Sequence, residues 1–202
     1  AKFEASNSSG KIKVEPGVQS WRSITVNDIY TNCLNYNKTL NSHMMKNDEW
    51  GAVAYLSKSR YGKSAEVDRN GNSSYYTGGG SGNAYVNNVG QSTTGTVHGV
   101  YDMSGGAWEY VAAYVNNGNS NLTNYGSSLV NGDAKTKNVY SKGSSDSRDN
   151  NYSANSGKYG DAVYETSANG NSSSSSWYGD CSYFPDTSDP FFSRGGYYSN
   201  GT

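Results

Sequence analysis

The chain has 202 residues, 33% of them hydrophobic, and 16 Lys and Arg against 17 Asp and Glu give a net charge of −1. No stretch approaches the ~20 apolar residues of a membrane-spanning helix, and the lysines form no basic arm or stripe, so we expect neither membrane insertion by this segment nor nucleic-acid binding. A folded core is still expected, because 19 Tyr, 4 Trp and 4 Phe supply large surfaces for burial, and the length fits one domain or one domain with an insertion.

The first 60 residues carry good signals for regular structure. Residues 11–14 alternate polar and apolar side chains, which predicts a short strand. Thr25 is the predicted N-cap of a helix, with Asp28 three residues later. The apolar residues that follow fall at the spacing of a single helical face: Val26, Ile29, Tyr30, Cys33 and Leu34.

A second helix is predicted to begin at Asn47, which we interpret as its N-cap, and to end near Gly62. Acidic residues stand in its first turn and basic ones in its last, as the helix dipole favours. Its predicted apolar side consists of Trp50, Val53, Ala54 and Leu56.

The histidines and cysteines give no catalytic or metal motif. His43 has no second histidine or carboxylate at metal-ligand spacing, which favours a surface or capping role. Cys33 and Cys181 are the two cysteines and neither belongs to a C-x-x-C pair. They could form one long-range disulfide, or serve as a buried apolar residue and a loop thiol, and the sequence leaves both alternatives open.

The middle of the chain changes from irregular to ordered. Residues 62–96 are rich in Gly, Asn, Ser and Tyr and predict loops. Residues 97–101 predict a short strand, residues 102–106 a turn, and residues 107–115 a strand that is apolar on both faces and therefore central in a sheet. Glu109 lies within that strand, and a buried carboxylate is costly unless it is paired or binds a metal.

From residue 116 to residue 176 the chain is polar again, which predicts an insertion within the domain. Short strands are predicted within it at residues 138–140 and 161–166. Aromatic residues then return densely up to the end of the chain, among Gly, Ser, Asp and Asn.

Residues 99–110, G-V-Y-D-M-S-G-G-A-W-E-Y, closely resemble the G-L-Y-D-M-S-G-N-V-W-E-W signature of the formylglycine-generating-enzyme-like (sulfatase-modifying-factor) branch of the C-type lectin fold. Residues 193–198, S-R-G-G-Y-Y, are similar to the R-G-G-S-W segment of that family. Residues 42–56 resemble the second-helix segment of surface and pilin-associated proteins of Gram-positive bacteria and their phages. The resemblance thus spans residues 42–198, and Gly106 departs from it where the signature has Asn.

The resemblance implies an α+β domain of C-type-lectin type, with two helices, a small twisted and mostly antiparallel sheet, and extensive loops. The predicted domain covers residues 1–202 and lacks the family's final C-terminal strand. The enzymatic branches need a pair of C-terminal cysteines or a histidine-rich iron site, and this sequence has neither set. We therefore expect this chain to resemble the non-enzymatic branch most. That branch includes phage tropism determinants and the variable proteins of diversity-generating retroelements.

Three functions follow from this resemblance. The first is an extracellular, non-catalytic ligand- or receptor-binding module on a bacterial surface, pilus or phage particle, with a host-cell protein or glycan as its partner. The second is a structural pilin-like or capsid-decorating subunit whose partners are neighbouring subunits. The third, which lacks its chemistry here, is an oxidoreductase of formylglycine-generating type.

The binding hypothesis also has support from composition. Tyr, Ser, Gly and Asn with Trp and Arg anchors are the residues that binding loops favour, because aromatic rings give contact area with few rotors. Clustered aromatic residues outside any apolar period predict an exposed binding face near the C-terminus. Its predicted members are Trp177, Tyr178, Tyr183, Phe184, Asp186, Phe191, Phe192, Arg194, Tyr197, Tyr198 and Asn200.

The resemblance also implies a structural Ca²⁺ at the turn before the central strand. The positions that supply calcium ligands in enzymes of the family match Asp102, Gly105, Ala107 and Glu109 here, two through side chains and two through backbone carbonyls. Such a mixture of oxygen ligands suits Ca²⁺. The alternative is that Glu109 is satisfied by a basic side chain or backbone N–H groups and that Asp102 caps its own turn.

Overall fold

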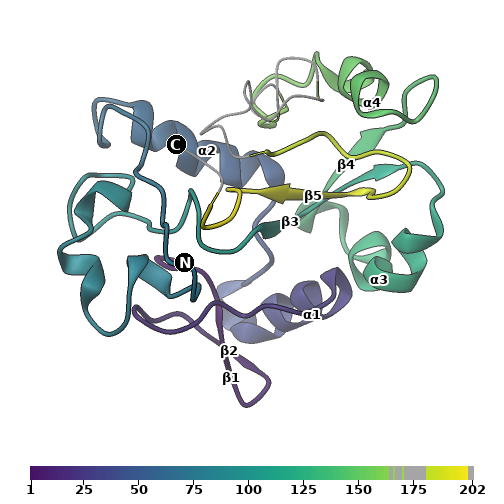
Figure 1. The fold of residues 1–202 in the computed structure, drawn as a ribbon. Coiled ribbons are helices and arrows are strands. Elements are labelled where there is room, and N and C mark those ends of the chain that lie inside the picture. The colour runs from purple at the N-terminus through teal and green to yellow at the C-terminus, as the bar shows by residue number, and fades with distance from the viewer. Residues whose placement is uncertain (164–165, 167–169, 171–180, 200–202) are drawn as a thin grey trace.

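A three-stranded sheet organises the structure, a computed structural model that describes residues 1–163, 166, 170 and 181–199. Strand β3 (Glu109–Asn116) is central, with β4 (Asn138–Ser141) parallel to it on one side and β5 (Phe191–Arg194) antiparallel on the other (Figure 1). The predicted central strand is confirmed. The sheet is mixed, however, because β4 runs parallel to β3.

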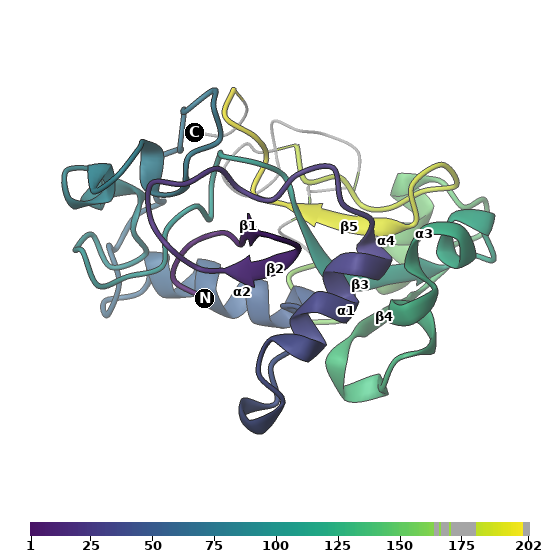
Figure 2. The same ribbon diagram turned by 90° about the horizontal axis from the view of Figure 1, so that it is seen from below.

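The two faces of β3 belong to two separate hydrophobic clusters, which explains why its sequence is apolar without alternation. Val111, Ala113 and Val115 pack in a cluster with Trp50 and Ala54 of helix α2 (Asn47–Lys58). The residues in between, Ala112 and Tyr114, pack against α1 (Val26–Tyr36) and α3 (Ser120–Asn131). Helices therefore cover both faces of the sheet (Figure 2).

The predicted start of α1 is confirmed and that of α2 is corrected. The Thr25 side chain accepts a hydrogen bond from the backbone N–H of Asp28 at 3.2 Å. The N-cap of α2 is Lys46, whereas Asn47 is the first helical residue. Asn47 is buried, and its side-chain amide donates to the Tyr140 hydroxyl at 3.0 Å, so it ties α2 to β4. Leu56, predicted for the apolar side of this helix, is exposed.

The remaining elements lie around this core. A small antiparallel hairpin joins β1 (Ser6–Ser8) to β2 (Lys11–Lys13), which confirms the first predicted strand. The polar stretch 116–176 contains β4, as predicted, but also α3 and α4 (Arg148–Asn155), which were not predicted. Five 3-10 turns complete the described residues: Lys38–Leu40, Thr77–Gly79, Ala84–Val86, Val89–Gln91 and Ala134–Thr136.

Two predicted strands are wrong in the residues that the structure describes. Residues 97–101 form turns and irregular backbone, and residues 161–162 form a turn. Residues 59–108 instead make an irregular lobe beside the sheet (Figure 1). The α+β class is confirmed by four helices and two small sheets among the described residues. None of those helices has the length and apolarity needed to cross a membrane.

The two cysteines are not joined in a disulfide. Cys33 packs at the edge of the cluster that covers Ala112 and Tyr114. Burial raises the pKa of its thiol to about 11, so the thiol is protonated at neutral pH and unreactive. Cys33 therefore has the structural role that its position on the helix face predicted.

Candidate functional site

The turn before β3 is the point where the lobe, the N-terminus and the C-terminal segment meet. Asp102, Gly105 and Gly106 all have positive φ, at 65°, 79° and 69°. This conformation aims successive N–H groups outward, so Gly105 donates to the carbonyl of Gly195 and Gly106 to that of Asn70, each at 2.8 Å. The motif turn is therefore joined by backbone hydrogen bonds to two distant segments, around Asn70 and Gly195.

Asp102 secures the lobe to this turn through its carboxylate. One oxygen accepts from the Gly78 N–H at 2.8 Å and from the Asn70 side-chain amide at 2.9 Å. The other accepts from the Glu4 N–H at 3.4 Å. Asp102 therefore caps backbone from other segments and not its own turn. Burial raises its pKa to about 6, and the hydrogen bonds from Gly78, Asn70 and Glu4 oppose that rise.

Glu4 is a buried carboxyl group that sequence reasoning missed. It accepts from the Ala107 N–H at 3.2 Å and from the Ser20 hydroxyl. Burial, followed by the charges of Asp102 and Glu109, raises its pKa well above the usual range. No pattern surrounds Glu4 in the sequence, so only the fold reveals its place beside the turn.

Glu109 begins β3 and lies opposite Arg194 in the strand register. Burial and then the charge of Asp102 raise the Glu109 pKa to about 8, while a hydrogen bond from the Trp50 side chain opposes the rise. Arg194 is fully buried, with its guanidinium 4.1 Å from the centre of the Trp50 ring. The buried Glu4 and Asp102 and the half-buried Glu109 thus form a carboxyl cluster, in which Glu109 is mainly protonated at neutral pH.

The turn contains one acid that needs no cation and one acid that a cation would stabilise. The Asp102 oxygens already accept three hydrogen bonds, which satisfies that carboxylate without a cation. Glu109, in contrast, is a desolvated acid beside a second acid, a situation that a divalent cation relieves. Among residues 1–163, 166, 170 and 181–199, no three His, Cys, Asp or Glu side chains are placed to hold a metal ion. The proposed ligands include backbone carbonyls, so the calcium site stays a prediction.

If calcium binds, we expect its addition to the chelator-treated protein to raise Tm. Saturation at 100 times Kd stabilises a folded protein by about 2.7 kcal/mol, which corresponds to about 5–10 °C for a domain of this size. The Glu109→Gln variant should lose this response, because it lacks the charged ligand. An unchanged Tm, together with no metal in elemental analysis of the native protein, would rule the site out.

A row of aromatic side chains lies next to the carboxyl cluster and reaches the surface. Trp108 contacts Tyr197, Tyr197 contacts Tyr198, and Tyr198 contacts Tyr75, each edge to face with ring centres 5.1–5.3 Å apart. Trp108 is 52% exposed and the three tyrosines are half-buried. We call Tyr75, Trp108, Tyr197 and Tyr198 the aromatic patch. The Tyr198 N–H donates to the Gly106 carbonyl at 2.9 Å, which attaches the patch to the motif turn.

Helix packing explains why this part of the sheet face stays open. Tyr110 contacts Phe191, which packs in the same cluster as Ala112 and Tyr114, so Tyr110 lies on that side of β3, and Trp108 immediately precedes the strand. Helices α1 and α3 cover Ala112 and Tyr114 but leave Trp108 and Tyr110 exposed. An exposed group of aromatic side chains is therefore built into one end of the sheet.

The predicted C-terminal binding face is divided by the structure. The prediction of exposure is wrong for Phe184, Phe191, Phe192 and Arg194, which are buried because β5 is a core strand and Phe184 packs on Phe192. Tyr197 and Tyr198 belong to the aromatic patch. Trp177, Tyr178 and Asn200 lie outside the described residues.

Tyr183 and Asp186 lie together in a different place. Arg148 of α4 forms an ion pair with Asp186 at 3.0 Å and places its guanidinium 4.3 Å from the Tyr183 ring centre. Asp186 also lines a groove of about 570 Å³ between residues 145–149 and 186–188. These two predicted residues therefore form a local cluster that is separate from the aromatic patch.

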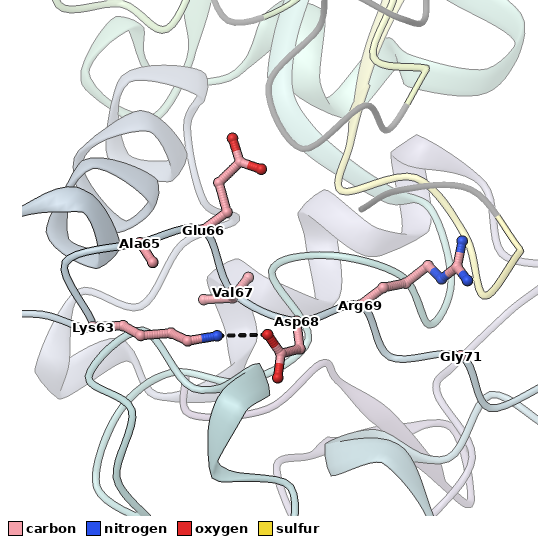
Figure 3. Close-up of a pocket in the computed structure, with 7 residues that line it drawn as sticks. All are labelled: Lys63, Ala65, Glu66, Val67, Asp68, Arg69 and Gly71. Carbon is pink, nitrogen blue, oxygen red and sulfur yellow. Dashed lines mark hydrogen bonds and ion pairs between the residues drawn. The ribbon is translucent and has the colours of Figure 1, made fainter.

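A second groove, of about 610 Å³, follows residues 63–71 (Figure 3). Lys63 pairs with Asp68 at 2.6 Å across it. At its other end Arg69 donates to the Ser199 carbonyl at 3.2 Å, and Gly71 lies beside the Tyr198 carbonyl. The groove therefore runs toward the aromatic patch, and the charges of Lys63 and Asp68 in its wall neutralise each other.

No protein-family model matches this chain, and no curated protein matches it at a significant level.

Proposed function

We propose that this chain is an extracellular, non-catalytic binding module with a C-type-lectin-like fold, displayed on a bacterial surface, pilus or phage particle. The observation that carries the proposal is the aromatic patch, which gathers rings from three separate segments at one exposed place. Tyr75 comes from the lobe, Trp108 from the motif, and Tyr197 and Tyr198 from the segment after β5. A thin core does not require such a row at the surface, and contiguous exposed aromatic rings are typical of interaction sites.

The way the patch is held also supports a binding role. Its rings contact one another edge to face, so their side chains lose little conformational freedom when a ligand binds. Tyr75 has a φ of 59°, an unfavourable conformation for a bulky residue. Its carbonyl accepts a hydrogen bond from the N–H of Ser20 at 2.9 Å, which holds it there. Backbone strain of this kind collects at functional sites.

The Trp108→Ala variant tests this proposal through cell binding. We expect fluorescently labelled protein to bind to a panel of animal and bacterial cells, and the variant to lose at least tenfold in affinity. Tyr159→Ala is the matched control, since Tyr159 is 92% exposed and lies outside the patch. Flow cytometry over a concentration series gives the affinities. Equal binding by both variants, or no binding to any cell type, would contradict the proposal.

A structural subunit is the second candidate function, and exposed apolar side chains away from the patch favour it. Leu40 is 75% and Tyr61 is 72% exposed. Sedimentation of the purified chain separates the two functions. A monomer that binds cells supports the binding module, whereas concentration-dependent polymers that Trp108→Ala leaves intact support the subunit.

A further inference from the structure

We propose that the aromatic patch and Arg22 together bind a polysaccharide that carries carboxylate groups. The inference rests on the proposed binding function and names the chemical class of its ligand. It assigns Arg22, Tyr75 and Trp108 to the site in addition to Tyr197 and Tyr198.

The rings of the patch suit a sugar. A pyranose ring has a flat face of C–H groups that packs on the face of an aromatic ring. The three contacts along the row are edge to face, so no two neighbouring rings in it are stacked face to face. Trp108, which is the most exposed of them, stands at the end of the row.

Arg22 gives the proposed site its preference for a ligand that carries a carboxylate group. Its guanidinium lies 3.9 Å from the centre of the Tyr75 ring, at the opposite end of the row from Trp108. Arg22 is exposed, and it makes no ion pair with an acidic group within the described part of the chain. Its charge is therefore available to a ligand. The planar fork of a guanidinium matches a carboxylate through two parallel hydrogen bonds, and stacking on Tyr75 orients the fork.

A general attraction for polyanions does not follow from the rest of the chain. The net charge is −1 and the lysines form no stripe, so a nucleic acid or a polyacidic peptide meets no extended positive surface. The Arg22 guanidinium lies at one end of the four aromatic rings. The site therefore fits a ligand in which one anionic group is attached to a ring with an apolar face. A sugar acid combines these two features in a single residue.

Calorimetric titration with hyaluronan oligosaccharides tests the inference, with neutral dextran oligosaccharides of similar length and poly-glutamate as comparison ligands. We expect hyaluronan to bind more tightly than either. Arg22→Gln should weaken hyaluronan binding at least tenfold and leave dextran binding unchanged, whereas Trp108→Ala should weaken both. Arg60→Gln is the matched control, because Arg60 is also an exposed arginine stacked on a tyrosine, 4.7 Å from the Tyr61 ring centre.

Several results would overturn the inference. These are no hyaluronan binding, equal binding of poly-glutamate, or equal losses in Arg22→Gln and Arg60→Gln. An unchanged Tm in each variant shows that it is folded. The proposed binding function is tested separately, by cell binding that depends on Trp108. If cells bind and hyaluronan does not, the binding function is supported and only the carboxylate-bearing ligand is excluded.

Discussion

Replacing Gly105 by alanine is expected to lower the free energy of unfolding by about 3 kcal/mol or more, and Tm by about 6–12 °C. Gly105 has a φ of +79°, a conformation that costs other residues about 1–2 kcal/mol. An added Cβ would also lie 2.4 Å from the carbonyl oxygen and 2.7 Å from the nitrogen of Asn70. Both of these atoms are hydrogen-bonded to the same turn, so neither can move away freely.

Gly10→Ala is the control that separates the two causes. Gly10 has a similar φ of +77°, but a Cβ there would meet nothing within 4 Å. We expect this variant to lose only the conformational part, about 1 kcal/mol or about 2–4 °C. Thermal melts and urea titrations of the three proteins measure the difference. Similar losses in both variants would show that the turn does not depend on close approach to Asn70.

The second large effect is a fall in stability as the pH rises, to which Glu109 and Glu4 both contribute because both have raised pKa values in the folded protein. The Glu109 pKa is about 8 in the folded protein against 4.5 when exposed, so the folded state holds the proton more strongly. The stabilisation is complete below pH 4.5 and is lost as the pH rises through 8. At about 1.36 kcal/mol per pKa unit this is at most on the order of 5 kcal/mol. Asp102, with a pKa of about 6, adds to the fall at lower pH.

Glu109→Gln should remove the part of this pH dependence that Glu109 contributes. The amide keeps the shape of the protonated carboxyl group and cannot ionise, so the variant is expected to exceed the native protein in stability at pH 8.5 and to match it at pH 4.5. Urea titrations across this range, with a chelator present, give the free energies. Glu15→Gln is the control, since Glu15 is a half-exposed acid that pairs with Lys13 on the surface. A native curve that stays flat between pH 4.5 and 8.5 would contradict the assignment.

Local sequence signals were sufficient for the elements that carry their own capping or periodicity. The Thr25 cap and the apolar stripe after it predicted α1, and the unbroken apolar run predicted β3. In contrast, α3 and α4 lie in polar sequence, where a few buried residues such as Leu122 and Leu129 decide the packing. Such helices depend on tertiary contacts more than on intrinsic preference.

The site was predicted only in part, because its residues meet through long-range contacts. Glu109 was predicted to be a buried acid from its place in an apolar strand, and it is half-buried in the structure. Tyr197 and Tyr198 were predicted from the density of aromatic residues. Phe191 and Phe192 have the same local composition, yet they pair with β3 and are buried. Glu4 and Arg22 reach the site from the N-terminal segment, and no spacing in the sequence connects them to it.

The pairing of the sheet sets the order in which it can be completed during synthesis. Ala113 pairs with Asn138, only 25 residues later in the chain, whereas Glu109 pairs with Arg194, 85 residues later. At about 5–20 residues per second, the ribosome needs about 3–10 s to make the 53 residues between Ser141 and Arg194. For that time one edge of β3 has no native partner, and an open strand edge is a template for pairing with another chain. The nascent protein is therefore most exposed to aggregation just before β5 is made, and slower translation of the preceding segment should lengthen that period.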